Sequence, residues 1–131
     1  MLERINPTTT QAWFVLKKHF EDEMSRKHMR DLFAADEKRF ETYSISTPDL
    51  LFDYSKNIIT DKTKQLLLQL ANECALKEAI DAQFSGQSIN ETENRAVLHT
   101  ALRNFKDAPV LVDGADVMPE IKRVLKQMKT F

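Results

Sequence analysis

The chain lacks the residues on which most β-rich and loop-rich proteins depend. Its 131 residues include only two glycines and four prolines. Glycine supplies the turns of all-β folds and the loops that cradle phosphates, so this scarcity favours helices. The sequence also contains no Walker loop, dinucleotide fingerprint or nucleophile elbow. We therefore expect a mostly helical protein without the common glycine-dependent catalytic loops.

Cysteine, net charge and long apolar runs are also scarce. Cys74 is the single cysteine, so no intrachain disulfide can form, and we expect it to be a small buried residue of a helix. The formal net charge is −1, which argues against nucleic-acid and membrane partners. No apolar run approaches the ~20 residues that span a bilayer. The opening MLERINPTTT does not resemble a signal peptide, so we expect a cytoplasmic protein.

Apolar residues recur at spacings of three and four in several segments, which is the period of helices packed on one face. Thr60 and Asn90 are suited to cap helix starts, and Gly86 is suited to a left-handed helix end. The expected helices run from about Thr8–Thr10 through Met24, through Met29–Phe33, from about Asp61 to Phe84, from Asn90 through Phe105, and from about Pro119 through Met128.

Two segments have the pattern of strands. Residues Phe40–Ser46 alternate large and polar side chains, and Leu50–Tyr54 follows the turn residues Thr47-Pro48-Asp49. This pair predicts a hairpin, and Pro109–Val112 before Asp113-Gly114 is a further strand candidate. The expected fold class is mostly α with a small antiparallel β-hairpin (α+β), in a single region covering residues 1–131.

The densest group of chemically active side chains lies near residue 95. On a helix, Glu91, Arg95 and His99 would share one face at successive four-residue steps. That face fits either an acid/base site or a capped helix start with a Glu91–Arg95 ion pair. His19 and His28 lie among charged residues, and we expect both at the surface rather than on a metal.

Two other polar clusters allow a functional and a structural interpretation. Residues 53–57 could contact a ligand or neighbouring domain, or could simply close a turn through side-chain hydrogen bonds. The cations near the C-terminus could form a phosphate-binding patch or the solvated face of an amphipathic helix; they are Lys122, Arg123, Lys126 and Lys129.

Four ordered blocks give the chain a family resemblance. The segment FSGQSINETENRAVLHTALRN, Phe84–Asn104, resembles the N-terminal block of glucose-6-phosphate isomerases, also called phosphoglucose isomerases. INPTTTQAW at Ile5–Trp13, DYSKNIIT at Asp53–Thr60 and VDGADVMPEIKRVLKQMKTF at Val112–Phe131 also resemble this family. Residues 25–46 match less well. The resemblance therefore spans nearly the whole chain.

The resemblance implies an enzyme of glycolysis and gluconeogenesis that interconverts glucose 6-phosphate and fructose 6-phosphate through an enediol. It implies no metal or organic cofactor, a sugar phosphate substrate, and a cytoplasmic homodimer when full length. It also implies that residues 1–131 form the N-terminal region of a sugar-isomerase (SIS-type α/β) enzyme. In that family the catalytic groups lie in downstream sugar-isomerase domains, which are absent from this sequence.

The resemblance changes the interpretation of the cluster near residue 95. It places no catalytic residue and no metal ligand within residues 1–131, and the family-signature residues are expected to be structural. These are Asn90, Thr92, Glu93, Arg95, His99 and Arg103. The helix ending at Phe131 has no glycine cap or polar tail, so we expect a truncated chain that is inactive alone. The alternative is a free-standing helical protein-binding module.

Overall fold

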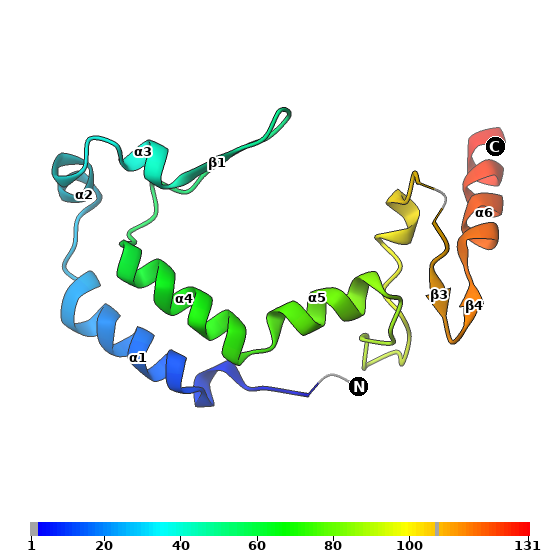
Figure 1. The fold of residues 1–131 in the computed structure, drawn as a ribbon, viewed down its shortest axis with the longest axis horizontal. Helices are drawn as coiled ribbons and strands as arrows, with labels where there is room; N and C mark the ends of the chain where they lie inside the picture. The colour runs from blue at the N-terminus through cyan, green and yellow to red at the C-terminus, as the bar shows by residue number, and fades with distance from the viewer. Residues whose placement is uncertain (1–2, 107) are drawn as a thin grey trace. The chain divides into compact units, whose positions relative to one another are not determined.

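The computed structural model describes residues 3–106 and 108–131, which form two compact units. One unit comprises residues 6–74, and the other comprises residues 3–5 with residues 75–131. In both units helices are longer than strands, and the strands form short antiparallel hairpins (Figure 1). The predicted class, mostly α with a small antiparallel β-hairpin, is therefore confirmed. Among the described residues, every helix is too short or too polar to span a bilayer.

The unit of residues 6–74 is built around two helices that lie side by side, α1 and α4 (Figure 1). Asn6 caps the first 3-10 turn, and the Thr10 side chain caps α1 by accepting from the Trp13 amide at 3.2 Å. The elements in chain order are η1 (Pro7–Thr9), α1 (Gln11–His19), η2 (Phe20–Met24), α2 (Met29–Ala35), α3 (Arg39–Thr42), β1 (Ser44–Ser46), β2 (Leu51–Asp53) and α4 (Asp61–Glu73).

The prediction that His19 lies at the surface is wrong. His19 is 4% exposed, and its Nε2 lies 2.9 Å from the Thr63 hydroxyl on α4. Thr63 also completes a reciprocal capping box with Thr60 at the start of α4. The imidazole therefore connects α1 to the cap of α4. The two residues are 44 positions apart, so the charged residues next to His19 in the sequence could not predict this contact. His28 is exposed as predicted, and it caps α2.

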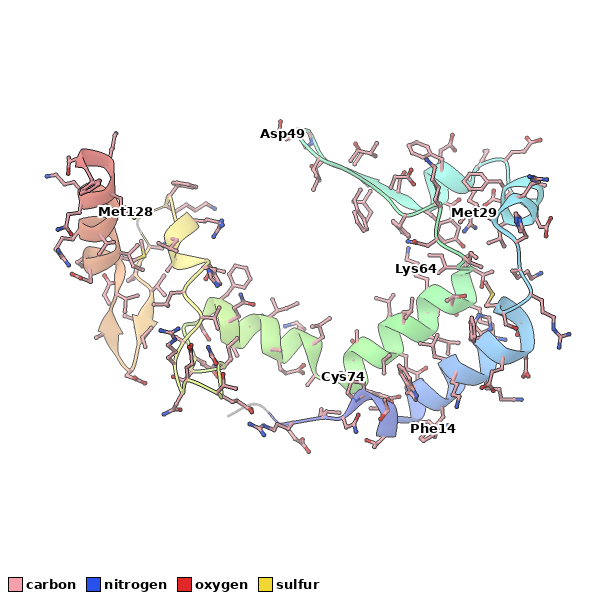
Figure 2. All side chains as sticks on the ribbon, turned by 180° about the vertical axis from the view of Figure 1, so that it is seen from behind. Phe14, Met29, Asp49, Lys64, Cys74 and Met128 are labelled. Carbon is pink, nitrogen blue, oxygen red and sulfur yellow. The ribbon has the colours of Figure 1, made fainter. Side chains whose placement is uncertain are left out.

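The predicted hairpin forms, but its first strand is shorter than expected. Ile45 pairs with Phe52 in the β1–β2 register, and Asp49 lies in the connecting turn (Figure 2). Residues Arg39–Thr42 form the helical turn α3 instead of a strand. Arg39, the first residue of this turn, is buried and donates to the backbone carbonyl of Ser55.

Arg39 organises the loop between β2 and α4. It is 3% exposed and donates to the backbone carbonyls of Ser55, Asn57 and Ile59 at 2.8–3.0 Å. Its guanidinium also lies 4.5 Å from the ring centroid of Tyr43. A delocalised cation with several donors suits this arrangement, because it satisfies diverging carbonyls while stacking on a ring.

The predicted helix from Asp61 to Phe84 is two helices. The first, α4, ends at Glu73, and α5 (Leu76–Phe84) begins after Cys74 and Ala75. Ala75 has φ 52° and ψ 38°, which is left-handed and interrupts the helix. Cys74 is therefore half-buried at the end of α4 (Figure 2) rather than buried inside a helix.

The second unit contains α5, η3 (Ala101–Arg103), β3 (Leu111–Val112), β4 (Ala115–Asp116) and α6 (Met118–Thr130). Gly86 follows α5 with φ +76°, which confirms the predicted left-handed helix end. The strand candidate 109–112 pairs with β4, giving a second hairpin that the sequence analysis did not anticipate. The C-terminal helix α6 forms as predicted, although it starts at Met118.

Candidate functional site

The signature segment Asn90–Arg103 begins with a turn at residues 90–95, which corrects the helix predicted from Asn90. Asn90 and Arg95 form an isolated antiparallel bridge, with both backbone N–H···O distances at 3.1–3.2 Å. Residue Asn94 has φ 49°, a left-handed conformation that closes the turn. Only the short η3 is helical in this segment. The predicted four-residue alignment of Glu91, Arg95 and His99 on one helix face therefore does not exist.

The predicted capping pattern is present, but it stabilises a turn. The Asn90 side-chain oxygen accepts from the Glu93 amide at 3.3 Å and from the Thr92 hydroxyl at 2.8 Å. Its side-chain nitrogen donates to the Glu93 carboxylate at 2.8 Å. Asparagine favours such local turns because its short side chain competes with the backbone ladder for hydrogen bonds. The Asn90–Glu93 pattern therefore stabilises a turn and does not start a helix.

The charges of the segment pair differently from the prediction. Arg95 forms an ion pair with Glu93 at 2.5 Å, and Glu91 pairs with Arg4. The Glu91–Arg95 pair proposed from helical spacing is absent from the described residues. Both observed pairs are exposed in part, so each contributes little stability in water. Their effect is to neutralise the carboxylates locally rather than to aim them at a common point.

His99 and Arg103 lie at the end of the segment. His99 is exposed, and its backbone carbonyl accepts from the Arg103 guanidinium at 3.0 Å. Among the described residues, no carboxylate lies within ion-pair distance of the His99 ring. A histidine acting in acid/base catalysis is usually oriented by such a partner. The described residues therefore do not form an assembled acid/base pair around His99.

A cavity of about 300 Å³ adjoins this turn. Its lining mixes the Arg95 and His99 side chains with apolar residues of the same segment; the complete lining is Asn90, Arg95, Ala96, Val97, Leu98, His99 and Leu102. Five of the six signature residues are exposed: Thr92, Glu93, Arg95, His99 and Arg103. Within the described residues, no group of three or more His, Cys, Asp or Glu side chains could hold a metal ion.

The polar cluster at residues 53–57 closes a turn. The Asp53 carboxylate accepts from the Ser55 amide at 2.9 Å and from the Ser55 hydroxyl at 2.7 Å. These two hydrogen bonds stabilise the charged form and hold the pKa of Asp53 below its ordinary value. Ser55 is 1% exposed, and Arg39 binds its carbonyl. The turn-closing interpretation of residues 53–57 is therefore confirmed. The buried contact from Arg39 was not predicted, because it joins residues 16 positions apart in the sequence.

The cations near the C-terminus lie on a solvent-exposed part of α6. Lys122, Arg123, Lys126 and Lys129 are all exposed. Arg123 forms a bidentate ion pair with Glu120, one turn earlier, at 2.6 and 2.8 Å. That pairing lowers the pKa of Glu120 and raises the pKa of Arg123. This arrangement agrees with a solvated amphipathic face.

A comparison with known protein families identifies the family of the chain. The family model of phosphoglucose isomerase matches residues 53–131 of the chain. That range contains three of the four resembling blocks, including the turn at Asn90, and it begins at the Asp53–Ser55 turn. It also covers more than half of the 131 residues. The chain therefore belongs to the phosphoglucose isomerase family.

Proposed function

We propose that residues 1–131 are the N-terminal region of a glucose-6-phosphate isomerase. The parent enzyme interconverts glucose 6-phosphate and fructose 6-phosphate through an enediol in glycolysis and gluconeogenesis. Sugar-isomerase domains that follow in sequence carry its chemistry. The observation that carries this proposal is the family match over residues 53–131, supported by the Ile5–Trp13 block outside that range.

The chemistry of this reaction explains why these residues alone would be inactive. Proton transfer between adjacent carbons needs a carboxylate base, a cation for the enediolate, an acid/base for ring opening and donors for the phosphate. Glu93 is already bound to Asn90 and Arg95, and His99 is exposed. The six signature residues therefore hold the turn and its surroundings, and none acts as a catalytic group. The base, cation and ring-opening group belong to other parts of the parent.

The remaining expectations follow from family membership. The parent takes a sugar phosphate as substrate, works without a metal or organic cofactor, and acts as a homodimer in the cytoplasm. Residues 1–131 pack against the parent's own downstream domains. Neither nucleic acid nor membrane is a partner, in keeping with the net charge of −1.

A coupled isomerase assay tests the proposal. The purified 131-residue chain and the full-length parent are supplied with fructose 6-phosphate, and glucose 6-phosphate formation is followed through a dehydrogenase. We expect turnover from the parent and none above the enzyme-free blank from the chain. Substantial turnover by the chain would contradict the assignment of catalysis to other residues. A lack of isomerase activity in the parent would contradict the function itself.

A second role for the signature segment is supported by the cavity beside the turn. Arg95 and His99 both line it, so they could border a substrate channel without touching the reacting atoms. The test is His99→Ala in the full-length enzyme, with His28→Ala as a control at another exposed histidine. A structural role predicts normal turnover per folded molecule. A large fall in turnover at unchanged stability would support the channel.

A further inference from the structure

The joint between α4 and α5, formed by Cys74 and Ala75, has an unfavourable backbone conformation. Ala75 is left-handed, and its Cβ makes that region unfavourable by about 1–2 kcal/mol relative to a right-handed helix. The residues around the joint, Glu73 to Lys77, read ECALK and include no glycine or proline. All are compatible with a helix interior, and alanine, leucine, lysine and glutamate are among the best helix formers. Local sequence therefore opposes the observed break.

Two further features of the break are unfavourable. No side chain caps the first turn of α5, because the residue at its N-cap is Ala75. The carboxylate of Glu73 ends α4, where the helix dipole is negative. A continuous helix across residues 61–84 would remove both costs. It would also bring Glu73 one turn from Lys77, which in the observed state pairs with Asp81 at 2.7 Å.

One contact in the unit of residues 6–74 offsets these costs. Glu73 Oε2 accepts a hydrogen bond from the backbone N–H of Ala12 at 2.8 Å. Ala12 is completely buried, so its amide needs a partner within the protein. The carboxylate also lies at the positive end of α1, where negative charge is favoured. Gln69 orients it by donating to Oε1 at 3.0 Å.

We propose that the break at Ala75 is one of two states of this segment, and that the Glu73–Ala12 contact selects it over a continuous helix. The joint falls between Cys74 and Ala75, where the chain passes from one compact unit to the other. The backbone torsion at Ala75 therefore decides whether α4 and α5 are two helices or one. In this proposal, α4 and α5 are separate helices while Glu73 caps α1, and they form one continuous helix when the Glu73 contact is lost.

Glycine substitution tests the observed state. Ala75→Gly removes the Cβ penalty of the left-handed conformation, so the folding equilibrium constant should rise about five-fold. The matched control is Ala79→Gly inside α5, which should lower that constant about five-fold. Urea unfolding measures both. If Ala75→Gly destabilises the chain as much as Ala79→Gly, position 75 is helical and the proposal fails.

Release of the contact tests the switch. In Glu73→Ala, the ¹³Cα and ¹³Cβ resonances of Ala75 should move toward helical values, and far-ultraviolet circular dichroism should gain helix. Glu73→Gln keeps an acceptor for Ala12 and should resemble the wild type. Glu73→Ala with Ala75→Gly should move less than Glu73→Ala alone, because glycine tolerates the left-handed joint. Wild-type resonances for Ala75 in folded Glu73→Ala would overturn the switch.

A second variant covers the case in which Glu73→Ala does not fold. Ala75→Val leaves the Glu73 contact intact and penalises the left-handed conformation, which β-branched residues very rarely adopt. Because the helix tolerates valine, this variant should also shift residues 74–76 toward helical resonances. Retention of a left-handed residue 75 in Ala75→Val would overturn the proposal independently.

Discussion

Arg39 is the residue on which the loop before α4 most depends. Among the described residues no carboxylate pairs with its buried charge, and three backbone carbonyls with two aromatic rings replace the lost hydration. Removal of one side of such a network leaves buried acceptors unsatisfied, which costs more than the hydrogen bonds contribute. Residues 55–59 lie within the range that matches the family, whereas Arg39 lies outside it. A residue outside the range that matches the family model thus holds the backbone of a loop inside that range.

Substitution of Arg39 by methionine should destabilise the chain by about 3 kcal/mol, since three carbonyls lose the guanidinium and only that of Asn57 keeps another donor, the Ile59 amide. Arg39→Lys should recover only part of the loss, because a single ammonium cannot reach diverging carbonyls while stacking on Tyr43. Urea unfolding measures both variants, with Arg30→Met at an exposed position as control. Equal stability of the Arg39→Met and Arg30→Met variants would contradict the role of the guanidinium.

The hydrogen bonds of Asp53 predict that acid lowers the stability of the folded chain. Because the Ser55 hydrogen bonds lower the pKa of Asp53 in the folded chain, they stabilise the fold above the ordinary pKa of aspartate. That stability is lost as pH falls through the lower, folded-state pKa. Carboxyl-carbon NMR titration should show the lowered pKa, and Ser55→Ala should return it toward the ordinary value. An unchanged titration in Ser55→Ala would assign the shift to another cause.

At the scale of elements, sequence patterns located most helices and failed where distant contacts decide the conformation. Thr60 and Gly86 worked as predicted because capping and left-handed turns depend on adjacent residues. The alternation in Phe40–Ser46 predicted one strand, but its first residues belong to α3, which begins at the buried Arg39. The break at Ala75 carries no local signal and depends on Glu73 reaching α1. At Asn90, the capping pattern fits both a helix start and the turn that is observed.

The two glycines give a matched pair for testing the turns. A Cβ added to Gly86 would lie 2.3 Å from the Leu111 carbonyl oxygen, whereas a Cβ on Gly114 would meet nothing within 4 Å. Both have positive φ, so alanine costs about 1 kcal/mol at each from conformation alone. Gly86→Ala should therefore cost several kcal/mol and Gly114→Ala only about 1 kcal/mol. Thermal unfolding compares them, and equal losses would refute the close approach.

At the scale of the whole molecule, the described chain leaves many large apolar side chains exposed. Phe105 is 90% exposed, Phe84 65% and Met128 70%, and the last of these lies on α6 (Figure 2). Single exposed apolar residues are normal, but gathered ones mark surfaces that contact something. This pattern agrees with the proposal that residues 1–131 pack against further domains of the parent.

The exposed apolar surface predicts strong binding of the dye ANS by the isolated 131-residue chain. Fluorescence enhancement per chain should fall sharply in the full-length parent, because the same side chains would be covered there. Met128→Lys and Phe105→Ser should lower the signal of the chain, and Thr130→Ser serves as a neutral control. Equal enhancement in the chain and the parent would argue that these residues stay exposed in both.

The buried His19–Thr63 hydrogen bond has a kinetic consequence. Thr63 serves two partners, the cap of α4 and the imidazole of α1, so the start of α4 cannot open while α1 stays docked. Amide protons at that cap should therefore exchange with solvent only during the larger openings of residues 6–74. The Asn90–Arg95 bridge is held by neighbours in sequence, and its amides should exchange through small local fluctuations. Hydrogen exchange would thus divide the chain into slowly and rapidly opening parts, with the family signature in the rapid one.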